Sequence, residues 1–329
     1  MYQIRTIPTH FQHWGFNAGV VPRPYGFLVA DRIQDGKAWS ILLRQFDHNW
    51  NEFSWSKHPN LYGMEDMRLI VPPNNPDLVI GYGTMLTYTD NFNFAKIGLG
   101  AAYIEDMSPP IHAESFNMTA DFKMQTVEKN WQMFFGEDHL HAIYSIEPHI
   151  ICDVNLQDFS CKRRCISSMV SHPWKWGELR GGAPPIWIGD RWLVPFHSRM
   201  TAATFSSMYP DHHRRLQKKL YYFAGFYTFE DKEPYRVLSI SNRPVNDMLP
   251  MTVECAERCL NLAGVAHWSN NHDVNVIFPV NGWRDNDHLM LVYGENDSRT
   301  CIARLPLAEV LANMEPVETK SSPFGKLHA

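Results

Sequence analysis

The chain has 329 residues, of which 44% are hydrophobic and 20% are charged. This balance predicts a packed globular protein and excludes a disordered one. The formal net charge of -5 offers no general attraction for nucleic acids or anionic membranes. Aromatic residues reach 13% of the chain, which suits a β-rich core or a carbohydrate cleft, because sugar rings stack their C–H faces on flat side chains.

The first residues, MYQIRTIPTHFQHWGF, lack the charged and then apolar pattern of a secretory signal. No run of about 18 apolar residues occurs, so the sequence predicts no membrane-spanning helix. The cysteine spacings do not match a zinc knuckle or finger, although a structural metal site stays the alternative to reduced thiols. We therefore expect a cytoplasmic protein with no metal site and with reduced cysteines at 152, 161, 165, 255, 259 and 301.

Five stretches along the chain share one pattern. Each begins with a turn cluster of Asp, Asn or Gly and continues as an apolar run rich in β-branched, aromatic and leucine side chains. Each then ends in polar residues. The stretches start about 40 to 100 residues apart, which is too uneven for a strict repeat but fits propeller blades that carry insertions. They lie at 35–46, 75–86, 137–148, 189–200 and 285–296.

Helical patterns are scarce in this sequence. DHHRRLQKKL (211–220) predicts a short, mostly polar helical insertion, and LPLAEVLANM (305–314) predicts a terminal helix. A doubly wound α/β fold needs a helix after nearly every strand, so we expect an all-β protein. No low-complexity linker divides the chain, and residues 1–329 are therefore expected to form a single β-propeller domain. The polar insertion could serve a contact between subunits of a homo-oligomer.

Polar residues at the strand ends are the candidates for a functional site. The innermost strands of a propeller surround a central channel, so polar groups at the same end of several blades converge there. A site with one or two acids among several cations suits a hydroxyl-rich substrate together with an anion. The candidates at strand ends or in flanking turns are Asn17, Arg44, Asp66, Arg68, Arg180, His197 and Tyr293.

The segment GMEDMRLI, which places Glu65 and Asp66 just ahead of Arg68, resembles the ED-x-R signature of the glycoside hydrolase family 130 β-mannoside phosphorylases. Those enzymes are five-bladed propellers. Five further segments resemble family elements and follow in the family's order. They are an Asn-x-Gly turn, a first-blade Arg strand, a Lys-Asn element, a Gly-Pro stretch leading to a His strand, and a Tyr-Gly strand, at 16–21, 40–46, 128–131, 176–198 and 275–297.

The sequence is also similar to the related family 108 β-1,2-mannosyltransferases and phosphorylases. It departs from the bacterial pattern at several positions. Met67 stands where the signature usually has Pro, Arg180 replaces a Lys, and the third-blade strand at 142–151 has no Arg where the phosphorylases place one. These departures leave phosphorolysis and transfer from a nucleotide-mannose donor both open.

The resemblance implies an inverting mannosyl transfer with Asp66 as the general acid. Inorganic phosphate would be the nucleophile and the co-substrate, so no protein base and no further cofactor are expected. The other substrates would be mannose, mannose 1-phosphate and mannose oligosaccharides. The residues implied to hold phosphate are Arg180, His197, Lys129, Tyr293 and Arg68, and those implied to bind sugar hydroxyls are Asn17, Arg44, Glu65 and Asp297.

Several of these residues also have structural alternatives. Asp66 could pair with Arg68 across the turn, because an acid pair before Arg occurs in many unrelated proteins. Arg180 precedes a Gly-Gly-Ala-Pro-Pro segment and could cap a turn through backbone carbonyls. His197 lies on a strand flanked by tryptophan and could be a core histidine.

Lys129 could be a solvated lysine, Arg44 could pair with Asp47, and Tyr293 could pack between blades. Two other functions also stay open. A β-mannoside hydrolase on the same fold would need a second carboxylate to activate water. A non-catalytic glycan-binding propeller would not need Asp66 at all.

Overall fold

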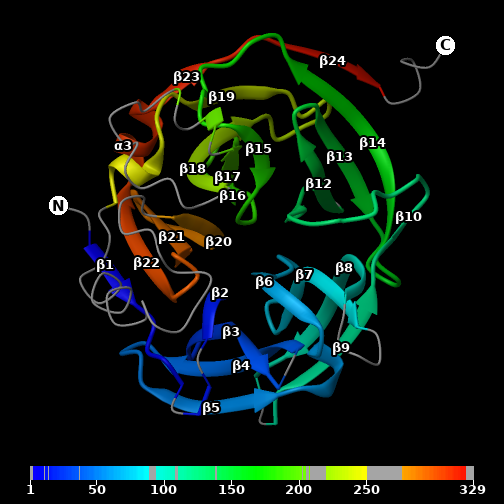
Figure 1. Cartoon of the computed structure of the whole chain (residues 1–329), viewed down its shortest axis with the longest axis vertical. Coiled ribbons are helices and arrows are strands. Elements are labelled where there is room, and N and C mark those ends of the chain that lie inside the picture. The colour runs from blue at the N-terminus through cyan, green and yellow to red at the C-terminus, as the bar shows by residue number, and fades with distance from the viewer. Residues whose placement is uncertain are drawn as a thin grey trace.

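Five sheets stand around a central axis in the computed structural model, as the blades of a propeller (Figure 1). This arrangement confirms the predicted all-β, five-bladed fold. The structure describes residues 3–10, 12–13, 15–36, 38–88, 94–107, 110–137, 139–201, 203–204, 207, 220–249 and 276–323.

Each blade is built on a meander of antiparallel strands, in which sequential neighbours pair. The first two blades contain β2 (Gly15–Arg23), β3 (Gly26–Asp35), β4 (Ala38–Asp47) and β5 (Glu52–Lys57), then β6 (Met64–Ile70), β7 (Leu78–Tyr88), β8 (Phe94–Glu105) and β9 (His112–Asn117). The third contains β11 (Gln132–Phe135), β12 (Leu140–Ile146), β13 (His149–Val154) and β14 (Ser160–Met169), extended by β10 (Thr119–Ala120).

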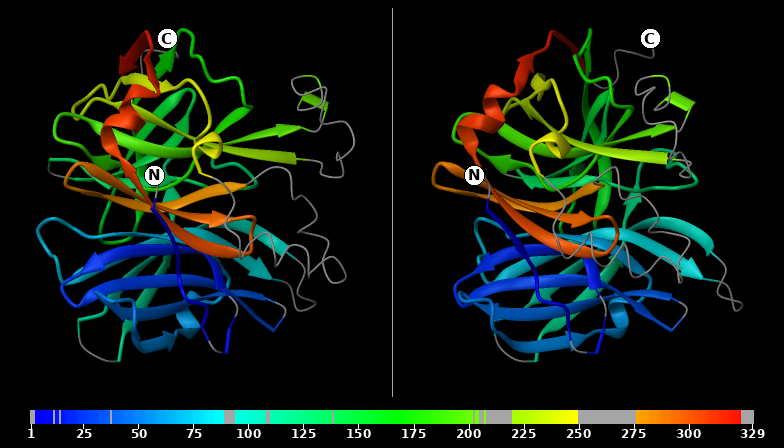
Figure 2. Two further views of the ribbon diagram at one scale, coloured as in Figure 1. Left: turned by 90° about the vertical axis from the view of Figure 1, so that its left-hand side faces the viewer. Right: turned by 60° about the vertical axis from the view of Figure 1, so that its left-hand side comes forward.

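The fourth and fifth blades follow the same plan. The fourth contains β15 (Glu178–Gly181), β16 (Ile186–Trp187), β17 (Trp192–Thr201), β18 (Leu220–Phe229) and β19 (Val237–Ser241). The fifth contains β20 (Ile277–Asp285), β21 (His288–Glu295) and β22 (Arg299–Pro306). Figure 2 shows β17 and β18, in yellow-green, projecting past their neighbours on one face of the ring.

Strands from the two ends of the sequence join blades that are distant in the chain. β1 (Gln3–Thr6) pairs antiparallel with β22 and completes the fifth blade. β23 (Met314–Pro316) adds to the fourth blade, and β24 (Thr319–Pro323) adds to the third. The pairing of β1 with β22 joins residues about 300 positions apart in the sequence. This pairing closes the ring.

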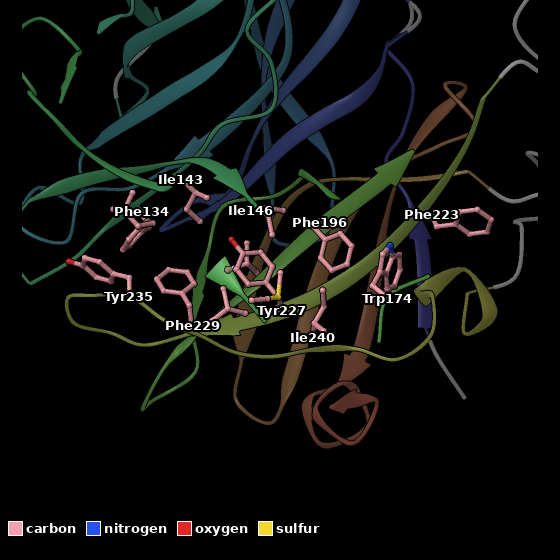
Figure 3. Packing of buried hydrophobic residues seen from close by; sticks show 14 of the residues in the cluster. Phe134, Ile143, Ile146, Trp174, Phe196, Phe223, Tyr227, Phe229, Tyr235 and Ile240 are labelled. Atoms are coloured by element: carbon pink, nitrogen blue, oxygen red, sulfur yellow. The ribbon is translucent and has the colours of Figure 1, made fainter. Parts of the chain in front are cut away.

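Hydrophobic side chains fill the spaces between blades. The largest cluster joins the third and fourth blades, where Phe134 meets Phe229 edge-on at 5.3 Å between ring centroids. Figure 3 shows these two rings on one side of the cluster, and Phe196, Trp174 and Phe223 on the other. Trp174 packs against Phe196 at 4.7 Å. Buried aromatic pairs contribute both apolar area and favourable ring geometry, so many of the aromatic residues stabilise the contacts between blades.

The five stretches predicted from the sequence lie in five different blades, as β4, β7, β12, β17 and β21. The predicted terminal helix is α3 (Leu307–Ala312), and two short 3-10 turns, η1 (Pro59–Leu61) and η3 (Val245–Asp247), are also present. The helix predicted at 211–220 lies outside the described residues apart from Leu220, which begins β18. Across the described ranges, no helix has the length and apolar character needed to cross a membrane.

Four cysteines lie within the described part of the chain. Cys152, Cys161, Cys165 and Cys301 are all buried. Each therefore packs as a small apolar side chain with a weak thiol donor. Cys255 and Cys259 lie outside the described residues.

Candidate active site

The inner strands β2 and β6 each carry a bulge near their first residues. The pairing register shifts between Phe16 and Gly19 on β2, and between Glu65 and Arg68 on β6. Asn17 and Asp66 lie within these bulges at φ angles of 51° and 49°, in the left-handed region that few non-glycine residues adopt. A bulge re-aims a side chain and marks functional sites in many sheets. Asn130 and Asp297 share this backbone conformation.

Asn17 links three blades through its side-chain amide. Its Nδ2 donates to Oδ1 of Asp66 at 3.2 Å and to Oδ1 of Asp297 at 3.1 Å. The fifth blade approaches this amide closely at Gly294, where an added Cβ would lie 1.6 Å from the Asn17 Oδ1. The contacts of Asn17 therefore require glycine at position 294. These contacts also bring together Asp66 and Asp297, two of the acids that the sequence assigned to the site.

Arg32, which the sequence analysis did not select, bridges the acidic pair. Its Nη2 donates to Glu65 Oε1 at 2.8 Å and its Nη1 donates to Asp66 Oδ1 at 3.0 Å. The guanidinium lies 4.1 Å from the Trp39 ring centroid and 5.0 Å from that of Phe16. Aromatic walls and two carboxylates fix the position of this charge. The sequence does carry the signal, since GFLVADR is an apolar run after a glycine turn that ends in a polar pair.

The two adjacent carboxyl groups have pKa values shifted in opposite directions. Burial tends to raise the pKa of Asp66, but the charges of Arg32 and Arg68 outweigh it and hold that pKa below its ordinary value. Burial raises the pKa of Glu65 above its ordinary value despite the attraction of Arg32, and the neighbouring Asp66 charge adds to this increase. Lys129 Nζ lies 3.4 Å from Glu65 Oε2. Paired acids with diverging pKa values are typical of acid–base sites.

Arg68 is buried at the centre of the ring and binds mostly backbone. Its Nε donates to the Gly182 carbonyl at 2.5 Å, its Nη1 to the Asp66 carbonyl at 3.0 Å, and its Nη2 to Asn130 Oδ1 at 3.2 Å. The pairing of Arg68 with the Asp66 side chain, considered from the sequence, is thus a contact with the main chain. Arg68 connects the second, third and fourth blades and brings a positive charge close to the acidic pair.

The fourth blade presents its polar groups on neighbouring strands. Arg180 on β15 lies opposite His197 on β17 in the strand register. The His197 ring is buried 4.8 Å from the Phe278 ring. Burial lowers its pKa to about 3, helped by the charges of Arg68 and Arg180, so the imidazole is neutral at pH 7. Its Nδ1 has no hydrogen-bond partner among the described residues.

Two residues along the strands, Glu178 on β15 lies opposite Arg199 on β17, and Arg199 lies opposite Tyr222 on β18. Burial raises the pKa of the Tyr222 hydroxyl, which is affected by Arg199, Asp297 and Arg180. Tyr222 is thus within electrostatic reach of both the arginines of the fourth blade and the acid of the fifth. Neither Arg199 nor Tyr222 was assigned to the site from the sequence.

Arg44, which the sequence predicted to bind sugar, is engaged by the protein itself. It is 1% exposed and uses all three side-chain nitrogens, for acids of the first blade and for the Pro8 carbonyl. Its Nη1 donates to Asp31 Oδ2 at 2.5 Å, and its Nε and Nη2 donate to Glu52 Oε2 at 3.0 and 2.6 Å. The alternative pairing with Asp47 is wrong, since these two acids take that role. The first-blade arginine at the acidic pair is Arg32.

Tyr293, which the sequence predicted to contact phosphate, is a buried residue of the ring. Tyr293 has no exposed surface and lies in the hydrophobic cluster between the fourth and fifth blades. Its neighbours there include Leu291, Cys301 and Ala224. The ring therefore packs between blades, as the alternative from the sequence described. Tyr222 is a tyrosine within electrostatic reach of Arg199 and Arg180.

No protein-family model matches the sequence. A curated relative, Beta-mannosyltransferase 3 from Komagataella phaffii, is 25% identical over 182 residues, which cover 44% of this chain and 28% of the relative. The chain thus spans less than a third of the length of that relative.

Two solved structures match over most of the ring. A β-1,2-mannobiose phosphorylase from Listeria innocua, in complex with β-1,2-mannobiose, has a TM-score of 0.59 at 14% identity and covers 93% of this chain and 94% of its own. A GDP-Man-dependent mannosyltransferase from Leishmania mexicana has a TM-score of 0.55 at 11% identity, with coverages of 92% and 90%. The chain has the fold of both enzymes. These neighbours agree with the resemblance found in the sequence.

The polar side chains of the site are carboxylates, cations and amides. Within the ranges that the structure describes, no group of three or more His, Cys, Asp or Glu side chains is placed to hold a metal ion. The acids Glu65 and Asp66 are bound by Arg32 and Lys129 instead. The arrangement offers one end rich in carboxylates and amides for hydroxyl groups, and another end with Arg180, Arg199 and His197 for an anion.

Proposed function

We propose that the protein is an inverting mannosyl-transferring enzyme, which moves mannose between mannose 1-phosphate and mannose or short β-1,2-linked mannose oligosaccharides. The observation that carries the proposal is the convergence of Asp66 with cations from separate blades around one channel. The fold shared with a mannobiose phosphorylase and a mannosyltransferase supports the substrate class. A nucleotide-mannose donor would place its phosphoryl groups at the same cations.

Asp66 is the proposed proton-transfer group. In phosphorolysis it gives a proton to the glycosidic oxygen, and in synthesis it takes one from the attacking acceptor hydroxyl. Its pKa below the ordinary value keeps it ionised in the free protein, which is the state that synthesis needs. Arrival of a phosphate dianion would raise this pKa by charge repulsion, so Asp66 takes up a proton more readily in the phosphate complex than in the free protein.

The anion end is assigned to Arg180 and His197, as the sequence analysis expected, and now also to Arg199 and Tyr222. Arginine forks bind phosphate oxygens by charge-assisted hydrogen bonds, and a neutral imidazole or a phenol adds a donor. Arg68 contributes its charge but keeps its bonds to carbonyls. Because phosphate is itself a nucleophile at neutral pH, no protein base and no cofactor beyond phosphate is assigned.

The sugar end is assigned to Asn17, Glu65, Asp297 and Arg32. These groups are already joined by hydrogen bonds and ion pairs, so a sugar hydroxyl would enter a preorganised set of donors and acceptors. Lys129 is placed beside Glu65, and this contact makes it a neighbour of the sugar rather than a separate phosphate ligand.

A β-mannoside hydrolase is the second candidate, because the site holds another carboxylate. Glu178 pairs with Arg180 and Arg199 of the fourth blade, and in a hydrolase it would be the candidate for the base that activates water. In that case phosphate would have no effect on turnover.

The proposal is tested with purified protein, mannose 1-phosphate and mannose. We expect release of inorganic phosphate together with elongation of the sugar, measured by a phosphate assay and by chromatography of the products. A parallel reaction with GDP-mannose identifies the donor. Phosphate-independent cleavage of β-mannosides, with no transfer from either donor, would favour the hydrolase.

A further inference from the structure

Glu178 binds two half-buried arginines of the fourth blade. Its Oε2 accepts a hydrogen bond from Arg180 Nη2 at 3.0 Å and another from Arg199 Nη2 at 3.1 Å. Alternate residues along a strand share one face of the sheet. The register pairs Glu178 with Arg199 and Arg180 with His197, so these four side chains lie on the same face. A carboxylate oxygen therefore lies between two guanidinium groups beside the neutral imidazole.

The other cations of the described site are already engaged. Arg32 is bound to Glu65 and Asp66, and Lys129 lies against Glu65. Arg68 is fully buried and donates to backbone carbonyls and an amide oxygen. An incoming phosphoryl group would therefore depend on Arg180 and Arg199. Together with the Glu178 carboxylate, the two guanidinium groups have a net charge of about +1. This charge does not balance that of a phosphate dianion.

The Glu178 carboxylate is bound weakly enough to dissociate from the two arginines. Its side chain is 60% exposed, and those of Arg180 and Arg199 are 31% and 38% exposed. Exposed ion pairs contribute little stability because water screens them and the side chains lose freedom. Glu178 can thus turn toward solvent when a stronger anion arrives, and this movement needs no change in the strands that carry the arginines.

We propose that Glu178 is an internal competitor for the phosphoryl site, and that it sets the affinity of Arg180 and Arg199 for phosphate. The inference rests on the proposed function, since it concerns the anion end of the same site. The carboxylate is the occupant in the free protein, and inorganic phosphate or the phosphate of mannose 1-phosphate replaces it. Glu178 weakens the binding of both phosphoryl ligands and leaves the binding of uncharged sugars unaffected.

The test is direct phosphate binding, measured by isothermal titration calorimetry without turnover. Glu178→Gln keeps the shape of the side chain and removes its charge. We expect it to bind inorganic phosphate about three- to tenfold more tightly than the wild type, as removal of one competing charge at an exposed pair allows. The same tightening is expected for mannose 1-phosphate, whereas binding of mannose should not change. The gain should shrink at high salt, where exposed charges are screened.

Asp190→Asn is the matched control. Asp190 is an exposed acid of the same blade that pairs with Arg191, so this variant removes one negative charge away from the site. Unchanged or weaker phosphate binding by Glu178→Gln, no measurable binding by either protein, or equal tightening by Asp190→Asn would each overturn the inference. Tighter binding by Glu178→Gln in a protein that transfers no mannose would support the inference and contradict the proposed function.

Discussion

Arg32 controls the charge state of the acidic pair. It donates to both Glu65 and Asp66, and its charge is the largest influence that lowers the pKa of Asp66. Trp39 and Phe16 hold the guanidinium in place from the sides. Because one planar fork reaches two carboxylates, a lysine cannot replace it without losing one of the contacts.

Arg32→Lys should therefore slow mannose transfer and change its pH dependence. We expect a loss of about 2–4 kcal/mol of transition-state stabilisation, as for removal of one preorganised donor. The pKa of Asp66 should rise in the variant, because its main counter-charge is weaker. Synthesis needs ionised Asp66, so the fall in rate on acidification should begin at a higher pH than in the wild type. The measurement is the pH profile of kcat/KM for transfer from mannose 1-phosphate.

Arg236→Lys is the control for this variant, since Arg236 forms a surface pair with Glu230. It should leave both the rate and the pH profile unchanged. An acidic limb of Arg32→Lys that coincides with that of the wild type would contradict the role given to Arg32.

Bulges in the inner strands are the elements that present Asn17 and Asp66. A regular strand alternates its side chains between two faces, and a bulge adds one residue and turns the next side chain. Both bulges lie near the first residues of their strands. β21 supports this arrangement from the fifth blade, because it runs past Asn17 with a glycine at the point of contact.

Gly294→Ala tests this packing. The added methyl group would overlap the Asn17 amide, so Asn17 must move and lose its bonds to Asp66 and Asp297. Overpacking of this kind costs about 1–3 kcal/mol of unfolding free energy, which thermal or denaturant unfolding should detect. The KM for the acceptor sugar should rise at the same time. A variant with wild-type stability and wild-type KM would show that the Asn17 contacts are not needed.

The sequence predicted where the strands lie better than it predicted which side chains of those strands lie at the candidate site. Each of the five stretches became a strand, because a turn followed by an apolar run is a local signal. The stretch at 35–46, however, is the third strand of its blade, whereas the other four are second strands. Arg44 lies opposite Val29 and Arg32 lies opposite Ile41. Because positions 29 and 32 are an odd number of residues apart on β3, the two arginines point to opposite faces of the sheet. The positions of the two arginines depend on how the strands pair in the sheet, and a local sequence pattern does not show strand pairing.

Side-chain parity bears on the position of Tyr293. This residue lies near the end of β21, and its ring belongs to the cluster between blades. Side chains alternate between the two faces of a strand, so a step of one residue exchanges a side chain that faces the channel for one that faces the core. Arg199 and Tyr222 were missed for a related reason, because their closeness to Arg180 follows from register across β15, β17 and β18. Asp66, Arg180 and His197 were assigned to the site from the sequence because the resemblance covers their motifs.

The whole ring is needed to assemble the candidate site. Asn17 and Asp297 are separated by 280 residues, and Arg68 and Gly182 by 114 residues, yet each pair is hydrogen-bonded. Ring closure through β1 and β22 brings the fifth blade next to the first. The fold positions acids and amides from three blades at one end of the site, and it positions cations of the fourth blade at the other.

The most direct measurement is the rate of mannose transfer from mannose 1-phosphate to mannose by Asp66→Asn, compared with the wild type. Asparagine keeps the size of the side chain but cannot move a proton, so the rate should fall by about 10²–10⁴-fold. The thermal unfolding temperature of the variant, measured in parallel, should show that the propeller remains folded. A folded Asp66→Asn variant that transfers mannose at the wild-type rate would contradict the account.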